Sequence, residues 1–209
     1  MATPYNRIAG GGLDRLSALS DGLFAIAMTL IVLEVHVPET ADVHSEGDLI
    51  RALGHVGPDL LVYGLSFLTL GIFWVGQGTQ LRHLARTDRH LLWLHLAFLA
   101  FVATMPFSTS VLTNFTSYRT ALLVYWLNIL LLGVTLYAAW AYAEGAGLVS
   151  ADAGPEVSAA IRRRIVVAQS LYAVGAALCI VSTGLAIAFI VAVQLNYAIA
   201  PRLPVLSRL

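Results

Sequence analysis

The sequence predicts an all-α, polytopic membrane protein with six transmembrane helices. Of its 209 residues, 58% are hydrophobic and 11% are charged, which leaves too few polar side chains to cover a water-soluble domain of this size. The apolar residues gather in long runs, and the chain length suits six spans of roughly 20 residues each. The net charge of zero gives no indication of nucleic-acid binding. We therefore expect one membrane-embedded domain over residues 1–209.

The predicted spans follow these apolar runs. The first ends before Pro38 and has no small-residue cleavage site after it, so we expect an uncleaved helix rather than a signal peptide. The second is long enough to tilt or to begin as an interfacial turn before Pro58, and the third carries Pro106 near its end. The apolar run 165–200 would make about 54 Å of helix, so we place a break at Ser182–Gly184. The expected spans are approximately 16–37, 49–78, 90–112, 118–142, 160–181 and 184–200.

The arginines predict the orientation of these spans. With six crossings, ten arginines fall on the side of both termini, and only Arg51 and Arg119 fall on the other side. Positive side chains accumulate on the cytoplasmic side of membrane proteins. We therefore expect a multi-pass protein of the cell membrane with both termini in the cytoplasm.

No motif in the sequence indicates an enzyme or a bound cofactor. The chain contains no Walker-type phosphate loop and no GxSxG or HExxH pattern. Its single cysteine, Cys179, cannot form a disulfide within the chain. We expect a protein without catalytic residues and without a cofactor.

The first span, RLSALSDGLFAIAMTLIVLEV (Arg15–Val35), has two different faces. At 100° per residue, Asp21 lies about 140° from Ile26, so the two side chains belong to opposite sides of the helix. One side carries Ser17 and Asp21. The other side is a stripe about 100° wide made of Leu19, Gly22, Ile26, Thr29, Leu30 and Leu33. Periodicity alone leaves open whether this stripe packs in a core or lines a pore.

Asp21 is the unusual residue of the first span. An ionisable group inside a membrane is costly and normally pairs within the helix bundle. Its candidate partners are Arg15, Ser20, Gln77 and His95. A structural network that anchors the first helix is the favoured interpretation, and a proton-carrying role for Asp21 is the alternative.

The first span resembles the signature of the TMEM175 family of potassium channels, in which an arginine and three further residues precede phenylalanine-serine-aspartate-glycine. The stretches FWVGQ (Phe73–Gln77) and DRHLLWLHLAFLAFVATMPFST (Asp88–Thr109) are also similar to this family. Leu19 stands where the family has the phenylalanine. Gln77 and His95 stand where histidine and asparagine are expected.

This resemblance implies a homotetramer in which four copies of the first helix line a pore for monovalent cations. The constriction would be built from aliphatic layers at Ile26 and Leu33, with Leu30 or Thr29 between them, and not from a TVGYG filter. A narrow ring of Ile26 can gate by dewetting. Gly22 and Leu19 would form the inner mouth, and a potassium ion would bind transiently near Thr29.

The resemblance thus implies a potassium-preferring channel, with proton permeation left open. Three other functions stay possible from the residues alone. A proton-coupled secondary transporter would use Asp21, but no repeat between the two halves is visible. An intramembrane enzyme would need a second acid at membrane depth. A non-conducting membrane scaffold would use the stripe as core.

Overall fold

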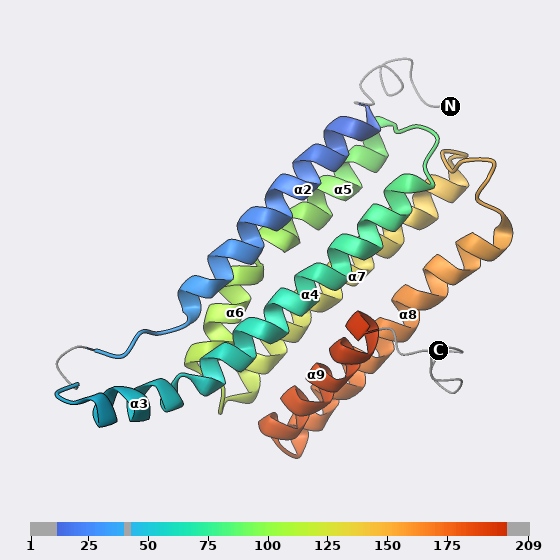
Figure 1. Cartoon of the computed structure of the whole chain (residues 1–209). Coiled ribbons are helices and arrows are strands. Elements are labelled where there is room, and N and C mark those ends of the chain that lie inside the picture. Colours follow the sequence, from blue (N-terminus) through green and yellow to red (C-terminus); the bar gives the residue numbers. More distant parts are fainter. Residues whose placement is uncertain (1–11, 40–42, 200–209) are drawn as a thin grey trace.

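The computed structural model describes residues 12–39 and 43–199, and over these ranges the chain is a bundle of helices (Figure 1). One isolated β-bridge is the sole extended pairing that they contain. The elements in chain order are α2 (Leu13–Leu30), η1 (Ile31–Glu34), α3 (Glu46–His55), α4 (Gly57–Arg82), α5 (Arg89–Ala103), α6 (Met105–Asn114), α7 (Arg119–Gly145), α8 (Pro155–Ala177), η3 (Leu178–Ile180) and α9 (Thr183–Ile199).

The predicted all-α, polytopic class is confirmed. Within the described ranges, five helical segments are long and apolar enough to cross a membrane: Leu13–Glu34, Gly57–Arg82, Arg89–Asn114, Arg119–Gly145 and Pro155–Ile180. The sixth predicted span is present as the apolar helix α9, whose 17 residues are about 25 Å long. The break between α8 and α9 falls at Val181 and Ser182, next to the predicted position. Length and composition therefore support five crossings, and the sixth stays a prediction.

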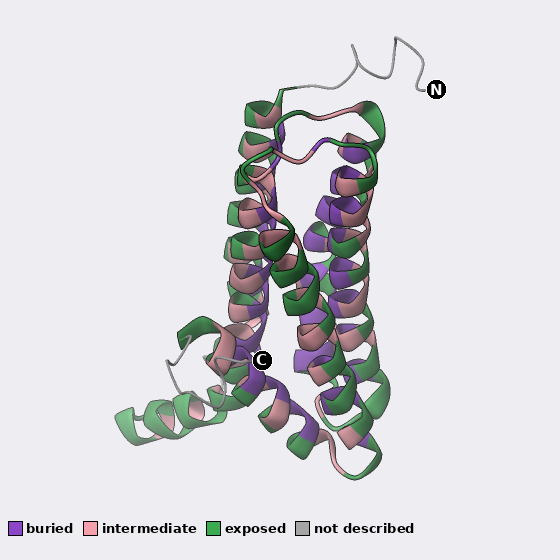
Figure 2. Ribbon diagram, turned by 90° about the vertical axis from the view of Figure 1, so that its right-hand side faces the viewer, coloured by how far each residue is buried: buried purple, intermediate pink, exposed green. Residues whose placement is uncertain are grey.

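The second apolar segment is two helices, and the division lies just before Pro58, where the sequence allowed an interfacial turn ahead of the span. Val56 separates α3 from α4, and Pro58 occupies the first turn of α4, where a missing N–H costs no helical hydrogen bond. Ser45 caps α3 by accepting a hydrogen bond from the backbone N–H of Asp48. No residue of α3 is buried, and the helix projects from the end of the bundle (Figures 1 and 2).

The third segment is also interrupted. Thr104 separates α5 from α6, and Pro106 lies in the first turn of α6. Proline cannot continue the hydrogen bonding of a preceding helical turn. Its position near the end of this segment therefore marks a new helix start, where the sequence predicted one continuous span.

Helix α7 is the centre of the packing, in contact with α4, α5, α6 and α8, whereas α2 lies at an edge of the bundle against α4 and α5 (Figure 1). The side chain of Phe24 joins α2 to this core. Its ring centroid lies 6.0 Å from that of Phe98, which lies 6.2 Å from that of Phe73. Tilted aromatic pairs at this spacing stabilise a core beyond their buried area. One side of α2 is thus fixed by its own subunit.

The loops at one end of the bundle are joined to each other. Leu84, after α4, forms the antiparallel bridge with Val149, after α7. Arg162 of α8 pairs with Glu144 of α7 at 2.8 Å. Further arginines lie in or beside these loops, and we call this the arginine-rich end: Arg82, Arg86, Arg89, Arg162, Arg163 and Arg164.

Gly175 allows α8 and α9 to approach closely. A Cβ added to Gly175 would lie 2.7 Å from Cγ1 of Ile190 and 3.2 Å from Cδ1 of Phe189. Small residues permit such close packing between membrane helices. Gly175→Val is therefore expected to lower the free energy of unfolding by about 1–3 kcal/mol, measured by thermal or denaturant unfolding in detergent.

Gly64→Val is the matched control, because nothing lies within 4 Å of a Cβ built at Gly64. It should change stability much less than Gly175→Val. Equal losses in the two variants would show that helix propensity, and not the contact between α8 and α9, determines the effect.

Candidate pore-lining helix

Helix α2 divides into a buried and an exposed face. The buried residues contact the rest of the subunit: Leu16, Ser20, Phe24 and Ala27, followed by Ile31 in η1. The predicted stripe faces the other way, and all six of its residues are exposed: Leu19, Gly22, Ile26, Thr29, Leu30 and Leu33. Among the large apolar side chains of the stripe, Ile26 and Leu33 are the most exposed, at 56% and 73%. The stripe is therefore not part of the core of its own subunit.

The C-terminal end of this face is wound more tightly than the α-helical repeat of 100° per residue from which the stripe was predicted. Ile31–Glu34 form a 3₁₀-helix, in which side chains three residues apart eclipse each other. Leu33 therefore stacks almost directly above Leu30, instead of lying about 60° away as in an α-helix. This difference makes the row from Ile26 through Leu30 to Leu33 straighter than predicted.

The hydroxyl of Thr29 is bonded to its own helix. Its Oγ1 lies 3.0 Å from the carbonyl oxygen of Ala25 and 2.9 Å from that of Ile26. Threonines in membrane helices often donate to the preceding turn in this way. Because the hydrogen is directed to the backbone, the oxygen keeps acceptor capacity. That capacity is compatible with a water molecule or a cation beside the exposed face.

Three of the five residues expected in a polar network lie together. The hydroxyl of Ser20 donates to Oε1 of Gln77, and Nε2 of Gln77 lies 3.3 Å from Nδ1 of His95. If the amide donates, His95 must be neutral with its proton on Nε2. All three side chains are buried and come from α2, α4 and α5. The chain Ser20–Gln77–His95 therefore fixes the rotation of α2 against its neighbours.

Asp21 differs from its expected position in this network. Its Oδ1 accepts a hydrogen bond of 2.8 Å from the indole Nε1 of Trp74, and the residue is exposed. Arg15 is exposed as well, in the first turn of α2. Asp21 is turned about 100° from Ser20 around the helix. The Asp21 side chain therefore lies beside the buried Ser20–Gln77–His95 network, at the exposed edge of α4.

Trp74 was missed by the sequence analysis, although it belongs to the quoted FWVGQ stretch. The indole N–H is a donor that usually finds a partner when its ring is packed. A tryptophan three residues before Gln77 was the available signal.

Trp74→Phe is expected to lower the free energy of unfolding by about 1 kcal/mol, because it removes one hydrogen bond to a carboxylate and keeps an aromatic ring. Thermal unfolding in detergent measures the loss. Trp93→Phe is the control, since Trp93 on α5 is 61% exposed. A loss as large for Trp93→Phe would contradict an anchoring role of the contact between Trp74 and Asp21.

Some of the known proteins that resemble this chain match its first half, and others match most of it. The family described as endosomal/lysosomal potassium channel TMEM175 matches residues 15–106. A potassium channel of Streptomyces collinus is 43% identical over 101 residues, which are 48% of this chain and 48% of the relative. A potassium channel of Chamaesiphon minutus is 30% identical over 189 residues, 88% of this chain and 93% of the relative.

An endosomal/lysosomal proton channel, TMEM175 of Bos taurus, is 35% identical over 108 residues, 49% of this chain and 22% of the relative. The matched region thus spans about half of the Streptomyces relative and about a fifth of the bovine one. The crystal structure of a lysosomal potassium-selective channel TMEM175 homolog from Chamaesiphon minutus superposes with a TM-score of 0.79 and 27% identity. It covers 91% of this chain and 98% of that one.

Proposed function

Because this chain belongs to the TMEM175 family of potassium channels, we propose that it is a potassium-preferring cation channel in the cell membrane. Two bacterial relatives are named potassium channels, and one of them matches over nearly its whole length. The superposed crystal structure is of a channel described as potassium-selective. These likenesses support ion conduction over an enzymatic function.

The observation that carries the proposal is the outward orientation of the α2 stripe. Exposed apolar side chains on a membrane helix fit lipid as well as a pore, so exposure alone does not decide between them. Two residues interrupt this apolar face: Gly22, which has no side chain, and Thr29, which adds a hydroxyl. On the opposite face, the buried Ser20 holds the helix in place through its hydrogen bond to Gln77. A fixed, partly polar face suits a pore wall better than a lipid contact.

In our proposal, four subunits bring four copies of this face around a common axis. Each stripe residue then becomes a ring, and the ring of Ile26 side chains forms a hydrophobic constriction that opens and closes by dewetting. Leu30 and Leu33 add further layers towards the outer end. Thr29 places hydroxyl oxygens beside a partly dehydrated ion, and Leu19 and Gly22 form the inner mouth.

The proposed selectivity depends on hydration. The outer end of α2 carries the partial negative charge of a helix C-terminus, and Glu34 adds a carboxylate there, so cations are favoured over anions. Potassium holds its water less tightly than sodium and loses it at lower cost at an aliphatic constriction. We therefore expect a moderate preference for potassium.

Protons are a second candidate permeant ion, because vertebrate relatives carry the name proton channel.

In our proposal both termini are cytoplasmic, which follows from the distribution of arginines. Asp21 belongs to the rim contact with Trp74 and is not needed as a titrating carrier site. A proton-coupled transporter and a non-conducting scaffold are the functions that the experiment below must exclude.

The test is ion flux into liposomes that contain the purified protein, under potassium and then sodium gradients. We expect faster flux of potassium than of sodium and a chemically cross-linked species of four subunits. Flux that depends on an opposing proton gradient would support a transporter instead. The absence of flux under every gradient would contradict the channel and favour a scaffold.

A further inference from the structure

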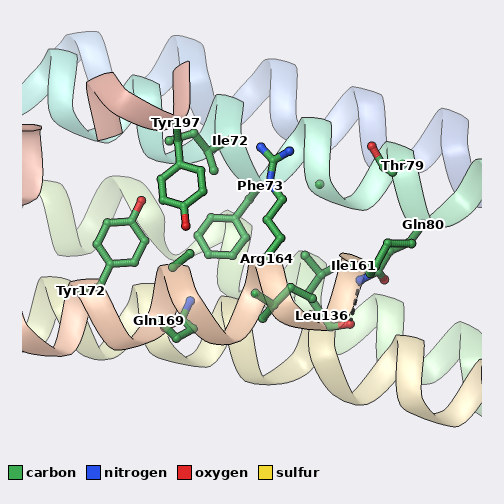
Figure 3. Close-up of a pocket in the computed structure, with 13 residues that line it drawn as sticks. Ile72, Phe73, Thr79, Gln80, Leu136, Ile161, Arg164, Gln169, Tyr172 and Tyr197 are labelled. Atoms are coloured by element: carbon green, nitrogen blue, oxygen red, sulfur yellow. Dashed lines mark hydrogen bonds between the residues drawn. The ribbon is translucent and has the colours of Figure 1, made fainter. Parts of the chain in front are cut away.

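A second polar site lies away from α2, at a cavity of about 70 Å³ among α4, α7, α8 and α9 (Figure 3). Helices α8 and α9 lie outside residues 15–106, which match the family. Most of the cavity wall is apolar, and its polar lining residues are Thr79, Gln80, Arg164, Gln169, Tyr172 and Tyr197.

Three polar atoms of these residues have no hydrogen bond of normal geometry among the described residues: Oε1 of Gln80, Oε1 of Gln169 and the hydroxyl of Tyr172, which has the side chain of Gln194 beside it. Tyr172 and Gln80 are nearly completely buried, with 1% and 2% exposure. Leaving a buried polar group without a partner is unfavourable. The cavity therefore needs an occupant that both accepts and donates hydrogen bonds.

The two glutamine oxygens are held in place by the amide nitrogens. Nε2 of Gln80 donates to the carbonyl oxygen of Leu136 at 3.2 Å, and Nε2 of Gln169 donates to that of Ile129 at 3.3 Å. Each amide nitrogen is thus used within the bundle, and each oxygen is left as an acceptor. Both acceptors require a hydroxyl or a water as donor.

Arg164 supplies positive charge at the same cavity. Its Cζ lies 5.7 Å from the ring centroid of Tyr197, and it forms no ion pair with any residue that the structure describes. Arg162, two residues earlier, is already paired with Glu144. The apolar part of α8 begins directly after Arg164. Arg164 therefore stands where α8 enters the membrane at the arginine-rich end, the depth at which lipid phosphates lie.

We propose that this cavity binds the headgroup of an anionic phospholipid whose phosphodiester carries hydroxyl groups, such as phosphatidylglycerol. Its phosphate oxygens accept hydrogen bonds from Arg164 and Tyr172, and a hydroxyl donates to the oxygen of Gln169 or of Gln80, which are anchored to carbonyl oxygens seven residues apart on α7. The cavity volume of about 70 Å³ leaves room for several water molecules. That size admits part of a headgroup but no acyl chain, so the chains stay in the surrounding leaflet.

The test uses the purified full-length protein in detergent and measures its thermal unfolding with added phosphatidylglycerol or phosphatidylcholine. We expect phosphatidylglycerol to raise the midpoint by several degrees, and phosphatidylcholine to have little effect. Arg164→Gln should weaken the effect of phosphatidylglycerol by at least tenfold in lipid concentration. Arg163→Gln removes the same charge at a residue that does not line the cavity, and it should behave like the native chain.

Tyr172→Phe is the second variant, for the case that Arg164→Gln does not fold. It removes only the hydroxyl and retains the ring. It should weaken the effect of the lipid without abolishing folding. Equal responses of Arg163→Gln and Arg164→Gln, together with a native response of Tyr172→Phe, would overturn the site. Equal stabilisation by glycerol 3-phosphate or inorganic phosphate would show a soluble anion as the occupant and overturn the lipid. Neither readout depends on ion conduction.

Discussion

Replacing Ile26 with asparagine is expected to raise potassium flux several-fold and to bring the ratio of potassium to sodium flux close to one. A ring of amides in place of a ring of butyl groups keeps water in the constriction and lowers the cost of passing a hydrated ion. The measurement is flux into liposomes under matched potassium and sodium gradients. Ile26 is 56% exposed and on the free face of α2, so the substitution should leave folding intact.

Val134→Asn is the matched control for Ile26→Asn. Val134 lies on α7 and is 53% exposed, so it tests a polar substitution of similar exposure away from the stripe. We expect Val134→Asn to conduct like the native protein. Unchanged conduction of Ile26→Asn would keep the channel and place the constriction at another residue. Altered conduction of both variants would show a general effect of polarity in the membrane.

Gln77→Leu is expected to lower the free energy of unfolding by about 2–4 kcal/mol, because Ser20 and His95 each lose a buried hydrogen-bond partner. The loss should also release α2 from its fixed rotation, and potassium flux should change with it. Thermal unfolding and liposome flux of the same preparation measure the two effects.

The combined variant Ser20→Ala, Gln77→Leu and His95→Leu separates hydrogen bonding from packing. Removing all members of a buried network together can be nearly neutral, since no unpaired group is left behind. We expect it to recover at least half of the stability that Gln77→Leu loses. No recovery would mean that the volume and shape of Gln77, and not its hydrogen bonds, determine the effect.

The fold class could be predicted because hydropathy acts over whole segments. The break between α8 and α9 was predicted to within two residues, but the breaks in the second and third segments could be predicted only in part. The apolar segment 49–78 is nearly continuous in composition, and only Gly57 and Pro58 mark the point where α3 ends and α4 begins. Similarly, Pro106 indicated a change near the end of the third segment, but not that Thr104 would separate two helices.

The two faces of α2 could be predicted because the 100° repeat is a local property of one helix. The partners of Ser20 and Asp21 depend on how α4 is rotated against α2, which no local pattern gives. Trp74 and Gln77 both face α2, one turn apart. Gln77 meets Ser20, and Trp74 meets Asp21. The sequence therefore predicted a polar anchor, but it placed Asp21 in the same network as Ser20 and Gln77 and did not identify Trp74 as its partner.

The 3₁₀ winding at Ile31–Glu34 determines the length and angle of the chain that follows α2. Four residues rise about 8 Å in a 3₁₀-helix and about 6 Å in an α-helix. Rewinding them as an α-helix would shorten the segment by about 2 Å and rotate Leu33 by about 60° relative to Leu30. In the proposed tetramer, this small screw motion would change the aperture at Leu33 while Ile26, about two turns away along the helix and anchored by Phe24 and Ala27, stays in place.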